Sequence, residues 1–313
     1  MQSPVVRSED AAEKIVQATL ALDKKFDRSV SLLTWGYNEE ELVQSFLDRA
    51  FDLLRRTAHD FEIVFVNDAS TDGTGEILEQ YAAGEPRLRV ITHARNLNVG
   101  MACRTAVQNA TKEVLFWQTV DWSYDLRNLR IFLELLNYFD VVQGVRPTPE
   151  RLLSHIPGIR SVYRAKTRSD NIRKAIISLS NYYLLRILYG AHFHDFQNVT
   201  FYPRRLVQSL GLRGKTSFVN PELLIKTYHA GATFLEVPIH FIPRTGGTAK
   251  GTKLTTVIRS AVDVIGNAIS WGWKGRSIHE TRESAPRIFR VSEPFFLEEK
   301  VLYLVVPLLK DFR

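Results

Sequence analysis

The chain has 313 residues, 45% of them hydrophobic, which is enough for one large or two modest cores. A single cysteine excludes a disulfide framework and fits a reducing compartment, and a net charge of +7 implies an anionic partner. The N-terminus lacks an apolar signal core, and the apolar run 301–309 is too short to span a bilayer, so we expect a soluble or peripheral protein.

Helices and strands alternate over the first half of the chain. The patterns predict helices over 8–26, 39–57, 71–83, 99–110 and 126–139, and strands over 30–34, 61–67, 88–92, 114–117 and 140–144. This alternation predicts an α/β fold with a Rossmann-like, mostly parallel sheet flanked by helices.

The pattern changes after Gly144. Residues 146–174 carry eight basic and two acidic side chains and begin as a loop rich in proline. The order then predicted is a helix over 171–189, a strand at 201–202, a helix over 221–230, a strand over 234–241 and an amphipathic helix over 254–273. We divide the chain into an N-terminal helical extension (1–28), a main domain (29–253) and a C-terminal helical segment (254–313).

Carboxylates follow three of the predicted strands. Asp68 and Asp72 come after the apolar strand 61–67, and Asp121 follows the strand 114–117. Ligands of open α/β sheets gather at the carboxyl ends of strands, so these side chains are candidates for binding. Tyr37 and Glu39 follow the first strand, where a ring and a carboxylate can stack on and hydrogen-bond a base. Asp121 could bind a hard cation, which takes oxygen ligands.

Two later segments suggest binding chemistry. Asp195 is a carboxylate between an apolar helix and an apolar strand, and Arg244 and Lys250 lie in a glycine-containing loop that suits closure over phosphate. The run GLRGKT at 211–216 suggests a phosphate-binding loop, but Ser209 stands where the Walker pattern needs glycine.

Taken together, the motifs resemble a family 2 inverting glycosyltransferase with the GT-A fold, over roughly residues 30–253. The residues that match are Tyr37-Asn38-Glu39, Asn67 to Thr74, and Arg95, Asn96, Asn98 and Gly100 at a helix start. Thr119-Val120-Asp121 takes the place of the family's Asp-x-Asp metal motif, with Thr119 as the first residue. Gly144-Val145-Arg146, His194-Asp195-Phe196 and the Arg244 to Lys250 loop are more similar to the polyprenyl-phosphate sugar transferases of that family.

The resemblance implies a nucleotide diphosphate sugar as donor. Its contacts would come from Tyr37, Glu39, Asp68, Asp72, Asn98 and Lys250, and the catalytic residues would be Asp121, Asp195 and Arg244. Asp121 would also hold Mg²⁺ or Mn²⁺. The acceptor would be a polyprenyl phosphate, which is largely ionised at neutral pH and needs no strong base. If the acceptor is a saccharide hydroxyl, as in cell-surface glycan synthesis, Asp195 is the candidate base.

The remaining expectations concern location and alternatives. The basic segment and the helix 254–273, with Trp271 and Trp273, would dock on an anionic membrane, which places the protein in the cytoplasm or on the inner face of the cell membrane. One alternative is a non-catalytic relative that binds nucleotide or glycan, favoured by Thr119. Another is a nucleic-acid-binding protein, but no recognition motif for nucleic acid is present.

Overall fold

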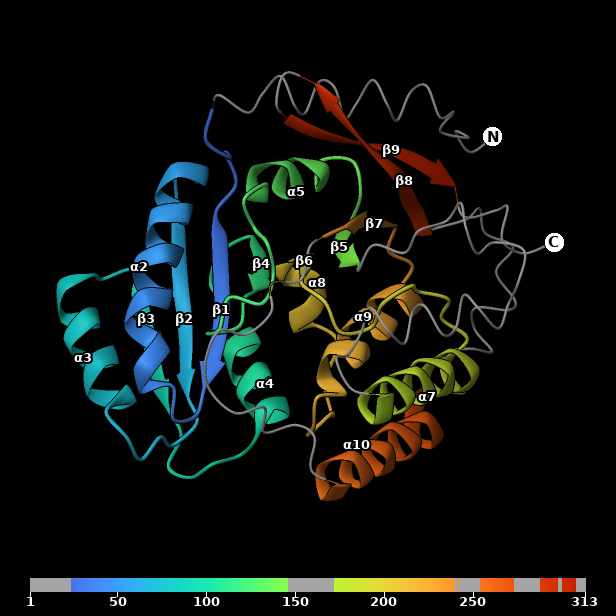
Figure 1. Cartoon of the computed structure of the whole chain (residues 1–313), viewed down its shortest axis with the longest axis horizontal. Coiled ribbons are helices and arrows are strands. Elements are labelled where there is room, and N and C mark those ends of the chain that lie inside the picture. The colour runs from blue at the N-terminus through green and yellow to red at the C-terminus, as the bar shows by residue number, and fades with distance from the viewer. Residues whose placement is uncertain are drawn as a thin grey trace.

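The fold is described from a computed structural model, which describes residues 24–145, 172–239, 242, 254–272, 288–297 and 300–307 (Figure 1). The strands are β1 (Val30–Gly36), β2 (Phe61–Asn67), β3 (Leu88–Thr92), β4 (Val114–Trp117), β5 (Val141–Val145), β6 (Thr200–Pro203), β7 (Phe234–Pro238), β8 (Ile288–Leu297) and β9 (Lys300–Pro307). The helices are α2 (Glu40–Thr57), α3 (Thr74–Gly84), α4 (Val99–Asn109), α5 (Leu129–Leu135), α7 (Ile172–Tyr189), α8 (Arg204–Gln208), α9 (Val219–His229) and α10 (Leu254–Asn267), which continues into a π-helical turn, η3 (Ala268–Gly272).

The described strands form one sheet in the order β3-β2-β1-β4-β6-β5-β7-β8-β9. β1 pairs in parallel with β2 and with β4, and β2 pairs in parallel with β3. The predicted α/β fold with a mostly parallel sheet is therefore confirmed. Because the chain moves from β1 to β2 on one side and later returns to β4 on the other, strand order switches between β1 and β4. Such switch points are where open α/β sheets bind ligands.

β6 runs against the direction of its neighbours. It pairs antiparallel with β4 through Leu115 and Tyr202, and antiparallel with β5 through Gln143 and Thr200. The amino end of β6 therefore lies at the carboxyl ends of β4 and β5. This reversal brings the loop that precedes β6, which contains Asp195, to the same edge of the sheet as the loops after β1, β2 and β4.

Three of the predicted helices have different bounds in the structure. α3 begins at Thr74 and not at Thr71, because Ser70 and Thr71 are engaged by Asn38 of the neighbouring loop. The helix predicted over 126–139 is α5, which is shorter (Leu129–Leu135), because the hydrogen bonds beyond it change to the tighter i→i+3 pattern. The helix predicted over 221–230 begins two residues earlier, at Val219.

The C-terminal segment 254–313 is only partly helical. α10 and η3 confirm a helix from Leu254, but residues 288–297 and 300–307 form an antiparallel pair of strands, β8 and β9. β8 pairs in parallel with β7, which would otherwise expose unpaired backbone groups at the sheet edge. The prediction of a helical segment is therefore wrong over residues 288–297 and 300–307. These residues form strands because β8 pairs with β7 and β9 pairs with β8.

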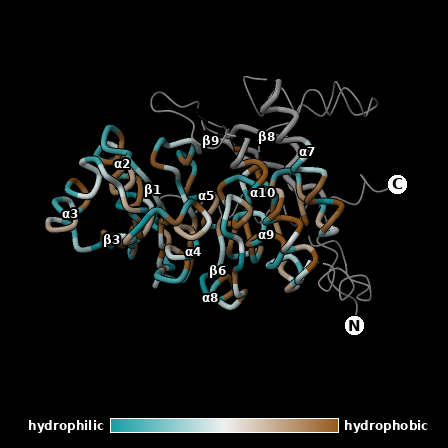
Figure 2. The backbone as a smooth tube through the Cα atoms, turned by 90° about the horizontal axis from the view of Figure 1, so that it is seen from below, coloured by the Kyte–Doolittle hydropathy of each residue, from teal (hydrophilic) through white to brown (hydrophobic). Residues whose placement is uncertain are grey.

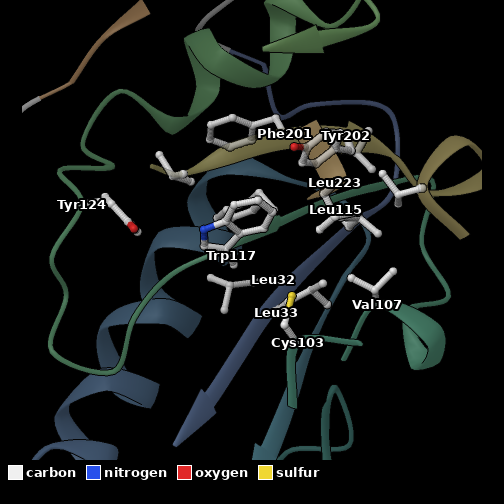
Figure 3. Packing of buried hydrophobic residues seen from close by; sticks show 14 of the residues in the cluster. Leu32, Leu33, Cys103, Val107, Leu115, Trp117, Tyr124, Phe201, Tyr202 and Leu223 are labelled. Carbon is white, nitrogen blue, oxygen red and sulfur yellow. The ribbon is translucent and has the colours of Figure 1, made fainter. Parts of the chain in front are cut away.

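The core lies between the sheet and its covering helices (Figure 3). Trp117 of β4 stacks on Tyr202 of β6 with 5.8 Å between ring centroids. Cys103 and Val107 of α4 are buried in the same cluster as Leu33 of β1. Burial raises the pKa of the Cys103 thiol, with a further contribution from Glu222, so this cysteine is an inert core residue.

α7, α9 and α10 lie together in one half of the molecule (Figures 1 and 2). The Tyr189 hydroxyl at the end of α7 donates to the Val264 carbonyl of α10, 2.7 Å away. Trp271 of η3 lies against Tyr189 and Phe218, and its Nε1 donates to Asn267. The sequence predicts Trp271 at a membrane interface, whereas in the structure its indole packs on Tyr189 and Phe218 and so attaches η3 to the body of the protein. Trp273 lies outside the described residues.

No helix within the described residues combines the length and hydrophobicity that crossing a membrane requires. The extension predicted over 1–28 is described only from residue 24. There the Phe26 amide donates to the Thr57 carbonyl, at the end of α2.

Candidate active site

The predicted site residues that the structure describes lie in loops along one edge of the sheet. Tyr37 and Glu39 follow β1, Asp68 and Asp72 follow β2, Asn98 follows β3, and Asp121 follows β4. The Asp68 amide donates to the Gly36 carbonyl, and the Gln118 amide donates to the Leu33 carbonyl. These two bonds continue the pairing of β1 with its neighbours beyond the strands, so the loops after β1, β2 and β4 start side by side.

The loops after β1 and β2 are joined by side-chain hydrogen bonds. Asn38 accepts a bond from the Thr71 amide at 2.8 Å and donates its own amide to the Ser70 hydroxyl at 3.0 Å. The Glu39 amide donates to the Thr74 hydroxyl. These contacts hold Tyr37 and Glu39 beside the loop that contains Asp68.

Asp72 connects the starts of α2 and α3. Its Oδ1 accepts bonds from the amide and the hydroxyl of Thr74, and its Oδ2 accepts the Glu40 amide. Burial opposes ionisation of Asp72, but the bonds from Thr74 and Glu40 outweigh it, and the pKa of this carboxyl lies below its usual value. The contacts that are described give Asp72 a structural role, and its binding to a nucleotide remains a prediction.

Asp68 organises the loop that leads from β3 to α4. Its Oδ1 accepts bonds from His93 Nδ1 at 2.7 Å and from the Leu97 amide at 2.8 Å, and its Oδ2 accepts the Asn98 amide at 2.9 Å. Only 4% of Asp68 is exposed. His93 was not singled out from the sequence, although it directly follows β3, where a ligand-facing residue is expected.

The loop that contains Asp121 is closed by its own polar groups. The Gln118 side chain donates to the Tyr124 carbonyl at 2.8 Å and accepts the Thr119 and Tyr124 amides at 3.0 and 3.3 Å. The Thr119 hydroxyl accepts the Ser123 amide, and the Ser123 hydroxyl donates to Asp121 Oδ1 at 2.6 Å. Thr119, at the first position of the metal motif, therefore supports the loop.

Strained backbone is concentrated along this edge. Within the described part of the chain, the non-glycine residues with positive φ are Asn38, Ala69, Asn98 and Trp122, at φ 54, 60, 70 and 55°. They lie after β1, β2, β3 and β4 in that order. Backbone strain of this kind often gathers at functional sites, where the surrounding structure holds it in place.

The loop before β6 is held by two buried polar residues from adjacent strands. Glu236 of β7 accepts the His194 amide at 2.7 Å and contacts His194 Nδ1 at 2.5 Å. Gln143 of β5, which pairs with Glu236 in register, donates to the Asp195 carbonyl at 2.5 Å. Asp195 is 3% exposed, and its Oδ1 accepts the Gln197 amide. Asp195 thus lies at the same sheet edge as Asp121.

The chain after β7 continues along the same edge. The Ile239 amide donates to the Val145 carbonyl at the end of β5, and the Ile242 amide donates to the Ser123 carbonyl in the Asp121 loop. Both distances are 2.8 Å. Arg244 and Lys250 lie outside the described residues, so their predicted roles remain predictions.

The run GLRGKT binds carboxylates of the protein itself. The Arg213 and Gly214 amides donate to buried Glu222 of α9, and the Lys215 and Thr216 amides donate to Asp263 Oδ2 of α10. Its donors are therefore used to attach α9 and α10, which agrees with the absence of a Walker pattern.

The donor set for a divalent cation is small. Asp121 would supply a carboxylate, and magnesium or manganese would draw its other oxygen ligands from a bound diphosphate and from water, as is usual for Mg²⁺ in phosphate sites. Among the described residues, no three His, Cys, Asp or Glu side chains gather as a metal centre. The residues present therefore fit a cation that binds together with a diphosphate.

An α/β sheet with polar loops at its switch point is typical of nucleotide-binding proteins. Residues 31–205, more than half of the chain, match the sequence profile of Glycosyl transferase family 2. The chain belongs to this family, and its fold is that of GT-A glycosyltransferases.

Curated relatives match parts of the chain. The uncharacterized glycosyltransferase EpsJ of Bacillus subtilis (strain 168) is 40% identical over 81 residues, which are 26% of this chain and 22% of that protein. The dolichyl-phosphate beta-glucosyltransferase ALG5C of Trichomonas vaginalis is 30% identical over 91 residues, or 28% of this chain and 27% of that protein. This chain therefore spans about a quarter of the length of these two relatives.

Among solved structures, glucosyl-3-phosphoglycerate synthase from Mycobacterium tuberculosis in complex with UDP is similar in fold. The TM-score is 0.52 at 13% sequence identity, and the alignment covers 100% of this chain and 98% of that protein. At this identity the likeness establishes the fold alone.

Proposed function

We propose that the protein transfers a sugar from a nucleotide diphosphate sugar to an acceptor, with inversion at the anomeric carbon. The observation that carries the proposal is the placement of Tyr37, Asp68 and Asp121 in neighbouring loops at the switch point of a family 2 fold. Structures of the M. tuberculosis synthase similar in fold contain UDP and Mn²⁺, which indicates the class of ligand to test first.

Asp68 is suited to read the base. A carboxylate offers about four lone-pair sites, and three of them are used by His93, Leu97 and Asn98. Carboxylate oxygens accept and do not donate, so the remaining site suits a base that carries a ring N–H, as uracil and guanine do. Uridine or guanosine diphosphate sugars are therefore the proposed donors.

Asp121 lies where the leaving diphosphate would collect negative charge. A bound Mg²⁺ or Mn²⁺ would supply electrostatic stabilisation of that charge. The Ser123 hydroxyl holds Oδ1 of Asp121, and the chain that leads to Arg244 passes Ser123 at Ile242. Arg244 and Lys250 follow Ile242 in the sequence and are the proposed basic groups for phosphate.

The proposed acceptor is a polyprenyl phosphate. The name of the ALG5C relative indicates a lipid phosphate substrate for that protein, and the basic segment 146–174 of this chain suits a phosphate. With an ionised phosphate as nucleophile no strong base is needed. If a saccharide hydroxyl attacks instead, Asp195 becomes the base, and Gln143 and Glu236 hold its loop in place.

We also propose that α10 rests on an anionic membrane. Four large apolar side chains, spaced as one helix face, are strongly exposed, namely Ile258 (55%), Val262 (66%), Ile265 (46%) and Ile269 (69%). The adjacent α7 adds Ile187 at 68%. An exposed apolar stripe on a helix is typical of peripheral helices that insert into a headgroup layer, and the basic segment 146–174 of the sequence suits anionic headgroups. The location that we propose is therefore the cytoplasm, with peripheral contact on the inner face of the cell membrane.

Nucleotide binding is tested by thermal shift and calorimetry with UDP, GDP, ADP and CDP, each with and without Mn²⁺. Ligand binding stabilises the folded state by mass action, so a true donor nucleotide raises the melting temperature. We expect stabilisation by UDP or GDP that depends on Mn²⁺. Transfer is then measured with the matching labelled nucleotide sugars and undecaprenyl or dolichyl phosphate. Binding without transfer to any acceptor would favour the non-catalytic relative, and no binding of any nucleotide would contradict the proposal.

Membrane contact is tested by co-sedimentation with two kinds of vesicle. One is phosphatidylcholine alone, and the other contains about one anionic phosphatidylglycerol in every three lipids. The full chain should bind the anionic vesicles, and the double variant Val262→Ser/Ile269→Ser should bind them several-fold less. The control is Val99→Ser, because Val99 is also an exposed valine but lies on α4 and not on α10. Equal binding of all three proteins would contradict the role of α10.

A further inference from the structure

We infer that Gln118 is a positioning residue that sets the loop presenting Asp121 to the diphosphate. The inference rests on the proposed function and deepens it. Gln118 directly follows β4 and is 1% exposed, so its carboxamide must find its hydrogen-bond partners inside the protein. No motif of the sequence assigns it a role.

The carboxamide closes the loop at both ends. Its Nε2 donates to the Tyr124 carbonyl, while its Oε1 accepts the Thr119 amide and the Tyr124 amide. The backbone donors require an acceptor, and the carbonyl requires a donor, so only one orientation of the carboxamide satisfies all three. One side chain therefore joins the first and last residues of the segment 119–124.

Between these ends the loop has little freedom. Trp122 has φ 55° and is 7% exposed, with its ring 5.7 Å from Phe46 and under the Arg49 guanidinium, which lies 4.2 Å from the ring centroid. Asp121 directly precedes this packed residue. A strained residue persists only where its surroundings hold it, and the Gln118 bonds together with the Trp122 contacts provide that support.

The chemistry explains why such support matters for Asp121. Stabilisation of a leaving group depends on charged groups that are already in place before the reaction. The family's metal motif is Asp-x-Asp, and Thr119 stands at its first position in this chain. Asp121 is therefore the acidic residue of the segment Thr119-Val120-Asp121. A shift of about 1 Å in a positioned group can cost about 100-fold in rate. Gln118 would prevent this shift without touching the substrate.

The test compares Gln118→Met and Gln118→Glu with matched variants of Gln208. Gln208 also braces a backbone turn, with its Nε2 donating to the Val107 and Ala110 carbonyls, but it lies by the amino end of β4, away from Asp121. The readouts are the affinity for UDP and for GDP with Mn²⁺ by calorimetry, and hydrogen exchange of the segment 118–124.

We expect Gln118→Met to bind the nucleotide with Mn²⁺ at least tenfold more weakly than the native protein and to exchange the Thr119 and Tyr124 amides at least tenfold faster. Gln208→Met should match the native protein within twofold in both readouts. Native-like affinity and native-like exchange in Gln118→Met would overturn the inference. If the native protein binds neither nucleotide, the proposed function fails. The hydrogen-exchange rates still show whether the Gln118 bonds hold the segment 119–124 in place.

Gln118→Glu provides a second test if Gln118→Met does not fold. A buried glutamate is protonated more readily than an exposed one, and the protonated acid regains a donor for the Tyr124 carbonyl. The affinity ratio of Gln118→Glu to the native protein should therefore rise several-fold as the pH falls from 8 to 5.5. A ratio that does not change with pH would contradict the donor role of Gln118.

Discussion

His93 and Asp68 form a buried pair that ties three elements together. His93 Nδ1 lies 2.7 Å from Asp68 Oδ1, and His93 Nε2 lies 3.0 Å from the Thr105 hydroxyl of α4. The side chains are 9% and 6% exposed. The pair thus joins the ends of β2 and β3 to α4, and it sets the position of the Asn98 loop at the proposed donor site.

Asp68→Asn tests this arrangement. The carboxylate of Asp68 now accepts hydrogen bonds from three donors. In asparagine the NH2 group would face at least one of these donors and could not accept its bond, so we expect a loss of ~1–3 kcal/mol in the free energy of unfolding. We also expect at least tenfold weaker binding of the nucleotide with Mn²⁺, because the loop at Asn98 loosens. Chemical denaturation and calorimetry measure the two effects. Asp60→Asn is the control, since exposed Asp60 pairs only with Lys112 at the opposite end of β2 in the described contacts. Equal behaviour of the two variants would argue against the role of Asp68.

Asp121→Asn should slow transfer by about 10²–10³-fold with little change in stability. Asn keeps an acceptor for the Ser123 hydroxyl but lacks the charge, and loss of such an electrostatic contact costs about 10²–10³-fold in kcat. The control is Asp125→Asn, four residues further on, where the carboxylate pairs with Arg127. Initial rates at saturating donor and melting temperatures should be compared. Full turnover by Asp121→Asn would disprove the proposed role.

Gly100→Ala should strongly destabilise the protein. An added Cβ would lie 2.2 Å from the Lys215 carbonyl carbon and 2.5 Å from the Thr216 nitrogen, and both are backbone atoms that cannot easily move. We expect a cost of about 2–4 kcal/mol, in the range of severe steric mutations. Gly266→Ala on α10 is the matched control, because nothing lies within 4 Å of the added Cβ. Since alanine favours helices over glycine by ~1 kcal/mol, that variant should be as stable as the native protein or more stable. Urea unfolding measures both values.

Glu85 makes part of the stability dependent on pH. Hydrogen bonds from Arg87, together with those from Arg55, lower the pKa of Glu85 to about 2, against a usual 4.5. Since the folded-state pKa lies below the unfolded one, this stabilisation is present above about pH 4.5 and is lost as the pH falls towards 2. Glu85→Gln should therefore melt at a lower temperature than the native protein at pH 7, and the difference should shrink between pH 4.5 and pH 3. A difference in melting temperature that stays constant over this range would contradict the ion pair.

Much of the fold could be predicted from short-range patterns. β2, β3 and β4 have the predicted bounds, because buried parallel strands are short apolar runs that end at polar loops. The residues at the carboxyl ends of β1, β2 and β4 could be named as site candidates for the same reason. These features depend on neighbours in the sequence, which the sequence shows directly.

Long-range contacts were not predictable. Three features depend on contacts between different elements of the fold. They are the antiparallel direction of β6, the pairing of β8 with β7, and the binding of Glu222 and Asp263 by the run GLRGKT. The same holds for Trp271, which resembles an interfacial residue in sequence but packs on Tyr189.

The sequence by itself determined the family, the α/β class and the carboxylates at the strand ends, because apolar periodicity and local motifs are written in consecutive residues. Only the tertiary structure decided which polar groups hold those carboxylates. Gln118, His93 and Glu236 act through hydrogen bonds with fixed geometry, and such bonds form only after the sheet has set the order and direction of its strands.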